Sequence, residues 1–311
     1  MSISCCSNSY VLKLDERNTW NLRATKSTEA WLQRFAMTLA LEHGHRREQP
    51  TITFVRGGGT GPPSTSLPWS PDSTALESLE MANWNRVRPG LSRFWSPPRG
   101  NDLVCELLNT ASEKLEVLMM GEVVHPVYLK AAQSGGLPIH GALIALDGRG
   151  VVLAGANDAG KTTSCSRLPD RWKVLCDDET LVMKGEGNQY RAHPFPTWSN
   201  LLRSGLGASC DISRSVPLSA FFFLQKATSP EIVSLGRGHA AARINESADE
   251  VWTWRGQYLE SKQLRAWRTQ LFENACSMSA NIPSYILRLD LYGRFWETIE
   301  RILEDLPVPG T

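Results

Sequence analysis

The stretch Gly150-Val-Val-Leu-Ala-Gly-Ala-Asn-Asp-Ala-Gly-Lys-Thr-Thr163 decides the fold of this chain. It begins with a short apolar run, Val151–Ala154, which predicts a buried strand. The following residues, from Gly155 to Thr162, match the P-loop pattern G-x-x-x-x-G-K-[ST], and a helix is expected from about Lys161. In this strand–turn–helix context, the pattern predicts a phosphate-binding loop rather than a glycine turn with a chance lysine.

The residue types in this stretch suit the binding of a chain of phosphates. Gly155 and Gly160 allow the backbone to approach a phosphate closely, so that consecutive N–H groups form an anion cradle. The helix that follows presents the positive end of its dipole to the same phosphates. Lys161 supplies a positive charge for the outer phosphates, and Thr162 supplies a hydroxyl for Mg²⁺. The predicted nucleotide contacts are Gly155, Ala156, Asn157, Asp158, Ala159, Gly160, Lys161, Thr162 and Thr163.

An acidic pair, Asp177 and Asp178, follows the loop after a helix of about two turns that Pro169 ends. The pair comes directly after a second short apolar strand, Val174–Cys176, and ligands of open α/β sheets bind at such strand ends. Two carboxylates that face a phosphate cradle need a cation between them, so the pair predicts Mg²⁺. An isolated Asp-Asp pair is more often a turn or a helix cap, but this one lies one strand–helix–strand unit after the loop.

The order of these motifs resembles the catalytic core of HPr kinase/phosphorylase, a relative of phosphoenolpyruvate carboxykinase. The resemblance covers residues 137–182: a His-Gly pair within Ile139–Gly150, an apolar hairpin, the P-loop and the acidic pair. It implies an α/β fold with a P-loop core and a mixed sheet, and it implies that ATP and Mg²⁺ are the cofactors. It also implies that His140 lies near the nucleotide phosphates, where it contacts phosphate or handles a proton.

Beyond residue 182 the chain is similar to HPr-kinase-like proteins of ribosomal peptide biosynthesis, which include lasso-peptide kinases and SynChlorMet cassette protein C. The shared features are His193–Ser199, the apolar strand Ala220–Leu224 and a final strand–helix unit. Asn157 and Asp158 stand where HPr kinases often carry a serine, and the later glycine–arginine signature of those enzymes is not recognisable. The resemblance therefore implies phosphoryl transfer without implying HPr as the acceptor.

Composition excludes several other classes of protein. The chain has 311 residues, 41% of them hydrophobic and 21% charged, and a formal net charge of +1, which gives no long-range attraction to nucleic acid. Seven cysteines without framework spacing indicate reduced thiols and a cytoplasmic setting. The first residues do not form a signal peptide, and no apolar run approaches the roughly 20 residues of a membrane span.

Three regions are predicted along the chain. Residues 1–55 form a small N-terminal α/β unit, in which Trp31, Phe35 and Leu39 share the buried face of a helix. Residues 56–101 are rich in proline and glycine and form a linker or insertion. Residues 102–311 form the catalytic domain. The linker carries three tryptophans and several arginines, so it either packs on its own domain or offers a docking surface for a peptide; the tryptophans are Trp69, Trp84 and Trp95.

The end of the chain shows the alternation of a strand and then the period of a helix. Leu287, Leu289 and Leu291 alternate with charged residues, which predicts a strand with these leucines in the core. The terminal helix is expected to bury four residues, namely Phe295, Ile299, Ile302 and Leu306.

The expected function is the transfer of the γ-phosphate of ATP to a Ser/Thr hydroxyl of a peptide or small protein, which the resemblance links to ribosomal peptide biosynthesis. Lys161, Asp177 and His140 are the predicted catalytic residues, with Asp177 as the base, while Thr162 and Asp178 hold Mg²⁺. The two aspartates can exchange these roles. A small-molecule kinase, acting for instance on free serine, and a non-catalytic ATP-binding adaptor remain alternatives. A GTPase-like switch is disfavoured because no Asn-Lys-x-Asp follows. Relatives are often oligomeric, so a homo-oligomer is also expected.

Overall fold

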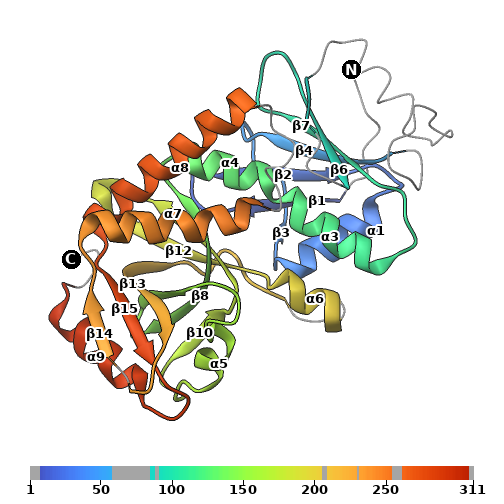
Figure 1. The fold of residues 1–311 in the computed structure, drawn as a ribbon. Coiled ribbons are helices and arrows are strands. Elements are labelled where there is room, and N and C mark those ends of the chain that lie inside the picture. The colour runs from blue at the N-terminus through green and yellow to red at the C-terminus, as the bar shows by residue number, and fades with distance from the viewer. Residues whose placement is uncertain are drawn as a thin grey trace. The chain divides into compact units, whose positions relative to one another are not determined.

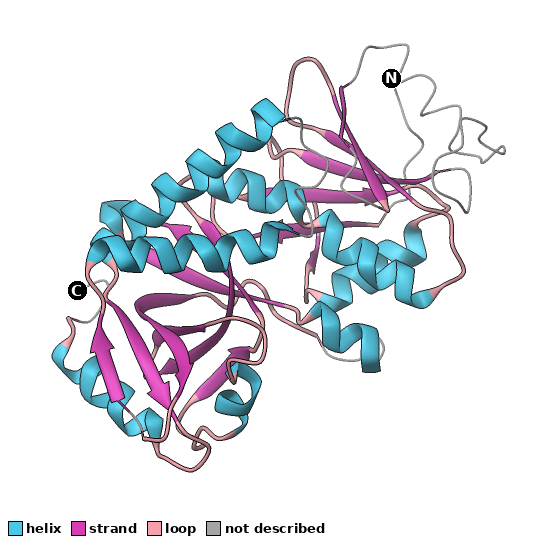
Figure 2. Ribbon diagram, viewed as in Figure 1, coloured by secondary structure: helices cyan, strands magenta, loops and turns pink. Residues whose placement is uncertain are grey.

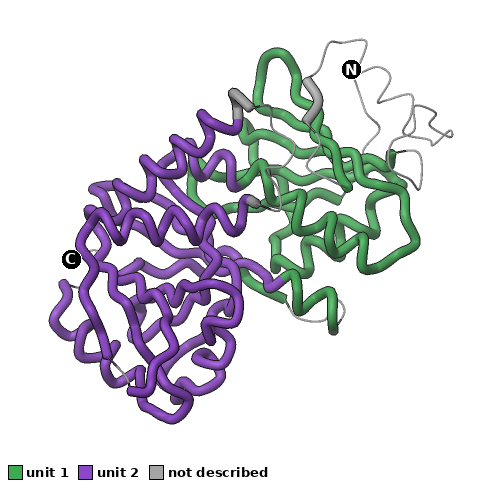
Figure 3. The backbone as a smooth tube through the Cα atoms, in the orientation of Figure 1, with its two compact units in different colours: residues 1–127, 198–211, 255–259 green, residues 128–197, 212–254, 260–311 purple. Residues whose placement is uncertain are grey.

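The computed structural model describes residues 8–57, 85–87, 91–204, 209–229, 231–253 and 261–307. The chain divides into two compact units, which Figure 3 colours separately. Unit 1 comprises residues 1–127, 198–211 and 255–259, and unit 2 comprises residues 128–197, 212–254 and 260–311. Each unit contains a sheet with both parallel and antiparallel neighbours, so the predicted α/β class with a mixed sheet is confirmed.

Unit 1 is built on a sheet with the strand order β3-β1-β2-β4-β7-β6-β5. The strands are β1 (Ser9–Lys13), β2 (Thr19–Ala24), β3 (Glu42–His43), β4 (Thr51–Arg56), β5 (Asn85–Val87), β6 (Ser92–Ser96) and β7 (Leu103–Leu107). β4 runs parallel to both β2 and β7. The boundary predicted at residue 102 therefore falls inside this sheet, between β6 and β7, because local sequence patterns show where strands lie but not which strands they pair with.

The helices of unit 1 are α1 (Glu29–Thr38), α3 (Glu113–Val123) and α6 (Trp198–Ser204), and α4 (His125–Gln133) continues into unit 2. The predicted buried face of α1 is confirmed, since Trp31, Phe35 and Leu39 are at most 1% exposed. The ring of Trp31 stacks on that of Phe35 with centroids 5.3 Å apart, and Phe54 from β4 lies 5.1 Å from Trp31. These aromatic contacts join the helix to the sheet.

One of the three tryptophans of the proline-rich region can be placed. Trp95 is 3% exposed, and its indole N–H donates to Glu106 Oε2 at 3.3 Å. Trp95 is therefore packed within its own unit, as the first of the two interpretations expects. Trp69 and Trp84 lie outside the described residues.

Unit 2 is built on one eight-stranded sheet with the strand order β10-β8-β11-β12-β13-β15-β14, and β9 pairs with β8 and β13 (Figure 1). The strands are β8 (Leu137–Leu146), β9 (Arg149–Ala154), β10 (Lys173–Cys176), β11 (Glu179–Lys184), β12 (Tyr190–Phe195), β13 (Val216–Lys226), β14 (Glu231–Ser234) and β15 (Ser284–Leu289). β8 pairs with β11 through residues 137–140 and with β9 through residues 141–146. The change of partner occurs between His140 and Gly141, where a Cβ on the glycine would lie 2.9 Å from Val152 Cγ1.

The β8–β9 hairpin turns at Asp147 and Gly148, as the sequence predicts. Their φ angles are +49° and +78°. Two positive values at the central positions are typical of the type I′ turn that matches the twist of paired strands, and an Asp-Gly pair favours this turn. The turn fixes the register of the strand that leads into the glycine-rich loop.

The helices of unit 2 are α5 (Lys161–Ser166), α7 (Arg237–Thr253), α8 (Ser261–Asn281) and α9 (Phe295–Asp305). α7 and α8 run side by side (Figure 2), and the rings of Trp252 and Trp267 meet between them with centroids 4.4 Å apart. Within the described ranges, no helix is long and apolar enough to cross a membrane.

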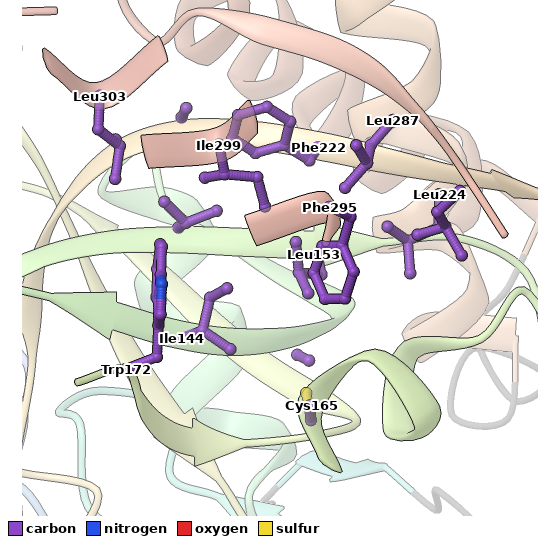
Figure 4. Packing of buried hydrophobic residues seen from close by; sticks show 14 residues of the cluster. Ile144, Leu153, Cys165, Trp172, Phe222, Leu224, Leu287, Phe295, Ile299 and Leu303 are labelled. Atoms are coloured by element: carbon purple, nitrogen blue, oxygen red, sulfur yellow. The ribbon is translucent and has the colours of Figure 1, made fainter. Parts of the chain in front are cut away.

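A hydrophobic core lies between α9 and the sheet of unit 2 (Figure 4). Phe295, Ile299 and Leu303 are buried there, whereas Ile302 and Leu306 pack only partly buried against the core. The prediction is therefore confirmed for Phe295 and Ile299, whereas Ile302 and Leu306 pack against the core without being fully buried. Leu306 also lies just beyond the last residue of α9, Asp305.

The strand prediction was also wrong at Leu291. β15 ends at Leu289, and Leu291 is 66% exposed. Asp290 ends the strand because its carboxylate accepts the backbone N–H groups of Tyr292 and Gly293, which folds the chain into a turn.

Replacing Phe295 by alanine is expected to destabilise unit 2 by about 3–5 kcal/mol, since it removes a fully buried aromatic ring and leaves a cavity. Phe295 also faces the guanidinium of Arg167, whose Cζ lies 5.5 Å from the ring centroid. Urea unfolding followed by circular dichroism measures the loss, with Glu304→Ala on the exposed side of α9 as the control. A change below about 1 kcal/mol would contradict the packing described above.

Candidate functional site

Strand topology brings three chain segments to one edge of the sheet in unit 2. β9 and β10 lie on either side of β8, and both run antiparallel to it, so their carboxyl ends point the same way. Ala154 at the end of β9 pairs with Gly141, and Cys176 at the end of β10 pairs with Leu143. The glycine-rich loop and the acidic pair, which follow these strands, therefore meet beside His140.

The glycine-rich loop 155–160 is closed by the lysine that follows it. Lys161 Nζ donates to the carbonyl oxygen of Gly155 at 2.7 Å and to that of Ala156 at 3.2 Å. A Cβ at Gly155 would lie 2.9 Å from the Cβ of Ala159, and Gly160 has a φ of +105°, so both glycines are required by the path of the chain. Only two of the three N–H donors of the ammonium are used by these carbonyls, which leaves one for a ligand.

Lys161 lies among acidic groups. Its side chain is 7% exposed, and burial lowers its pKa, while nearby carboxylates oppose this change by favouring the charged form. The carboxylates that act on it are, from the strongest, Asp178, Glu250, Asp158 and Asp177. Acidic charge thus exceeds basic charge around the loop, which favours the binding of a cation.

Asp177 is hydrogen-bonded to two threonines: Thr162, in the first turn of α5, and Thr197, shortly after β12. Thr162 Oγ1 donates to Asp177 Oδ2 at 3.3 Å, and the hydroxyl of Thr197 donates to Asp177 Oδ1. The carboxylate of Asp177 therefore lies next to the hydroxyl of Thr162, which the P-loop pattern assigns to Mg²⁺.

His140 bridges Asp178 and a glutamate from α7. Its Nε2 lies 3.1 Å from Asp178 Oδ1, and its Nδ1 is hydrogen-bonded to Glu250 Oε2. Because ionised carboxylates only accept hydrogen bonds, two such partners favour a ring with a proton on both nitrogens, the imidazolium. In agreement, the hydrogen bond to Asp178 raises the pKa of His140, and the bond to Glu250 adds to this, against the opposing effects of burial and of the Lys161 charge.

A further bond holds α7 against β8 at this point. Ser247 Oγ donates to the backbone carbonyl of His140 at 3.0 Å, three residues before Glu250. Residues three apart lie on one side of a helix, so Ser247 and Glu250 both face β8. The backbone and the ring of His140 are thus both fixed by the same helix face.

The donor set fits a magnesium ion that is completed by its ligand. Thr162 and Asp177 present two hard oxygen donors 3.3 Å apart. Among the described residues, no group of three or more His, Cys, Asp or Glu side chains is arranged to hold a metal. Mg²⁺ suits this arrangement because it keeps several waters and is usually held by one or two carboxylates together with substrate phosphates.

The structure thus places Lys161, Thr162, Asp177, Asp178 and His140 at one edge, with the loop beside them. Ala156, Asn157, Asp158, Thr162 and Thr163 are exposed there, while Gly155, Ala159 and Gly160 are partly exposed. His193, another residue of the quoted motifs, is instead 1% exposed, and its Nδ1 lies 2.9 Å from the carbonyl oxygen of Ile212, so it has a structural role.

Two residues of the site were not predicted. Thr197 lies within the motif His193–Ser199, but nothing in the motif indicates that its hydroxyl contacts Asp177. Glu250 lies in a helix 110 residues after His140. The sequence shows that Glu250 shares a helix face with Ser247. It does not show that this face packs against β8.

The comparisons with known proteins concern the region that contains this site. The family model of SynChlorMet cassette protein ScmC matches residues 103–304. No curated protein matches the chain. One matching solved structure is the Hpr(Ser) kinase/phosphatase from Coxiella burnetii, with 15% identity, 54% of this chain and 88% of that chain covered, and a TM-score of 0.30.

Fold and site define an α/β protein with a glycine-rich loop and paired carboxylates at one sheet edge. The family match spans well over half of the 311 residues and includes every residue of the site. The chain therefore belongs to the SynChlorMet cassette protein ScmC family.

Proposed function

We propose that this protein is an ATP-dependent phosphotransferase that transfers the γ-phosphate to a serine or threonine hydroxyl of a peptide or small protein. The observation that carries the proposal is the meeting of the lysine-closed loop with two carboxylates at one edge of the sheet. The sequence of the loop matches the P-loop pattern, in which backbone N–H groups and the lysine bind a polyphosphate. Acidic groups beside such a loop favour a nucleotide that arrives with Mg²⁺.

In this proposal the loop N–H groups and Lys161 hold the β- and γ-phosphates. Thr162 and Asp177 would hold Mg²⁺, which would supply positive charge beside the phosphoryl group. Thr197 keeps the carboxylate of Asp177 turned toward α5 through its hydroxyl. Positioning and charge neutralisation supply most of the rate in this class of reaction.

The contacts favour Asp178 as the base, which exchanges the roles first expected for the two aspartates. Asp177 is engaged by the threonine of the proposed metal site, whereas the side chain of Asp178 is 36% exposed and is oriented by His140. In the transfer step, a bond forms between the acceptor oxygen and the γ-phosphorus while the bond to the β-phosphate oxygen breaks. ADP leaves with that electron pair, and the acceptor proton passes to Asp178.

Glu250 is a positioning residue in this mechanism, because it orients the imidazolium that orients Asp178. Glu250→Ala is expected to lower kcat by about 10²-fold with the KM for nucleotide unchanged, since small displacements of a catalytic group have effects of this size. Glu250→Gln keeps one acceptor oxygen for the ring and is expected to lose less. Steady-state kinetics of the two variants measure both values.

The matched control is Glu246→Gln, an exposed acid one turn earlier on α7. It is expected to behave as the unmodified protein does. Equal losses in the alanine and glutamine variants, or a rise in KM without a fall in kcat, would exclude a positioning role for Glu250.

The test of the proposed function is the transfer of radiolabelled γ-phosphate from ATP to candidate acceptors. Peptide pools and metabolite pools are compared in parallel, with phosphoserine and phosphothreonine identified in the products. Family membership supports a peptide acceptor and a role in ribosomal peptide biosynthesis. Label on free serine or another metabolite alone would instead support a small-molecule kinase. Nucleotide binding without label in any acceptor would support an adaptor.

A further inference from the structure

The most exposed aromatic residue among the large hydrophobic side chains of the described chain lies in the turn after β15. Tyr292 is 91% exposed and its neighbour Leu291 is 66% exposed. Two adjacent exposed apolar side chains offer surface whose burial by a ligand is favourable. The position of this turn relative to the glycine-rich loop indicates which ligand would cover the two side chains.

The turn stands at the same sheet edge as the loop. β13 runs parallel to β9 on one side and to β15 on the other, so the carboxyl ends of all three strands point the same way. Ala154, the last residue of β9, and Ile286 of β15 both pair with Phe223. β15 continues for three more residues, about 10 Å, in the direction in which the loop leaves β9.

Hydrogen bonds join the turn to the end of α5, and the residue before the turn, Leu289, lies near the loop. A Cβ built on Gly160, the residue before Lys161, would lie 4.0 Å from Leu289 Cδ1. At the other end of α5, Arg167 Nη1 donates to the carbonyl oxygen of Asp290 at 2.8 Å, and Nη2 donates to that of Gly293. α5 has six residues and is about 9 Å long, so the turn lies within about one such length of the loop.

The turn is also held in one conformation. Asp290 Oδ1 accepts the N–H of Tyr292 at 2.9 Å and the N–H of Gly293, and these bonds lower the pKa of Asp290. The carboxylate of Asp290 is thus used within the turn, and Arg167 binds its carbonyls from outside. A fixed backbone that presents an aromatic ring and an aliphatic side chain suits the flat apolar face of a nucleobase, because stacking needs little further ordering.

We propose that Leu291 and Tyr292 form the platform on which the base of the bound nucleotide stacks. The proposal rests on the proposed function, since the loop must first hold the phosphates of that nucleotide. The ligand is a purine base joined to a polyphosphate. The platform contacts the flat face of the base and not the hydrogen-bonding groups at its edge. It therefore raises the affinity for nucleotides over polyphosphates that lack a base.

The test compares two ligands in calorimetry: MgATP and magnesium tripolyphosphate, which lacks the base and sugar. Tyr292→Ala is expected to weaken MgATP binding about tenfold, within the range measured for single base–aromatic stacks, and to leave tripolyphosphate binding unchanged. Tyr292→Phe keeps the ring and is expected to bind MgATP as the unmodified protein does. Phe272→Ala removes another exposed ring, from α8, and serves as the matched control.

Each other outcome overturns the proposal. If Tyr292→Ala binds MgATP as tightly as the unmodified protein, the turn serves another ligand, such as an apolar side chain of the acceptor or a second copy of this chain. Equal affinity of the unmodified protein for MgATP and tripolyphosphate would also exclude the platform while leaving the phosphate site intact. If the unmodified protein binds neither ligand, the proposed function itself fails and the platform fails with it.

Discussion

Lys161→Ala is expected to lower the rate of phosphoryl transfer by on the order of 10³-fold or more, as for other single charged groups aimed at a transferring phosphoryl group. Lys161 closes the loop through two carbonyl oxygens, so the substitution removes both the charge that meets the phosphates and a brace of the loop. MgATP affinity should fall as well. Initial rates at saturating acceptor, together with calorimetry for the nucleotide, measure the two effects.

The control is Lys173→Ala, which removes an exposed lysine from β10 in the same sheet. Thermal unfolding shows whether each variant is folded. Since Lys161 is buried among its own loop carbonyls, Lys161→Met keeps the aliphatic stem and separates the loss of charge from the loss of packing. Retention of more than a tenth of the activity in a folded Lys161→Met protein would be incompatible with the proposed site.

Substitution of the two aspartates is expected to change different kinetic quantities: kcat for Asp178 and the Mg²⁺ requirement for Asp177. Asp178→Asn should lower kcat by about 10²–10⁴-fold, the range for a lost general base, with no change in the Mg²⁺ concentration that gives half the maximal rate. Asp177→Asn should raise that Mg²⁺ concentration by about 10–100-fold, and part of its activity should return at high Mg²⁺. Magnesium titrations of the initial rate distinguish the two variants.

Asp170→Asn is the matched control, since Asp170 is an exposed acid shortly before β10. If the magnesium dependence shifts in Asp178→Asn and not in Asp177→Asn, the roles are those first expected from the sequence, with Asp177 as the base. An unchanged rate in both variants would remove the acidic pair from the mechanism altogether.

The parts of the site that lie close together in the chain could be predicted from the sequence. The loop, Lys161 and Thr162 form one uninterrupted pattern, and the acidic pair follows after one short helix. Glycines whose conformation or packing excludes a side chain leave a clear trace in a sequence, because few other residues can replace them. The β8–β9 hairpin was equally readable, since the Asp-Gly turn specifies its geometry.

The parts that depend on distant contacts could not be predicted. Glu250 reaches His140 across 110 residues, and Thr197 reaches Asp177 across 20, and neither pair has a spacing that a local pattern would reveal. The change of partner along β8 at His140 likewise follows from strand pairing rather than from residue type. For the same reason, the sequence did not show that β7 lies inside the sheet of unit 1, between β4 and β6.

The crowding of acids around Lys161 has a consequence for the evolution of the domain. Like charges brought together repel one another, so Asp158, Asp177, Asp178 and Glu250 depend on Lys161 and His140 for charge compensation in the ligand-free fold. A lineage that no longer needed this chemistry would not be constrained to keep the acids together with their cations. A homologue that kept the apolar core beneath α9 but replaced these acids would therefore be expected to keep the fold and lack the phosphotransferase activity.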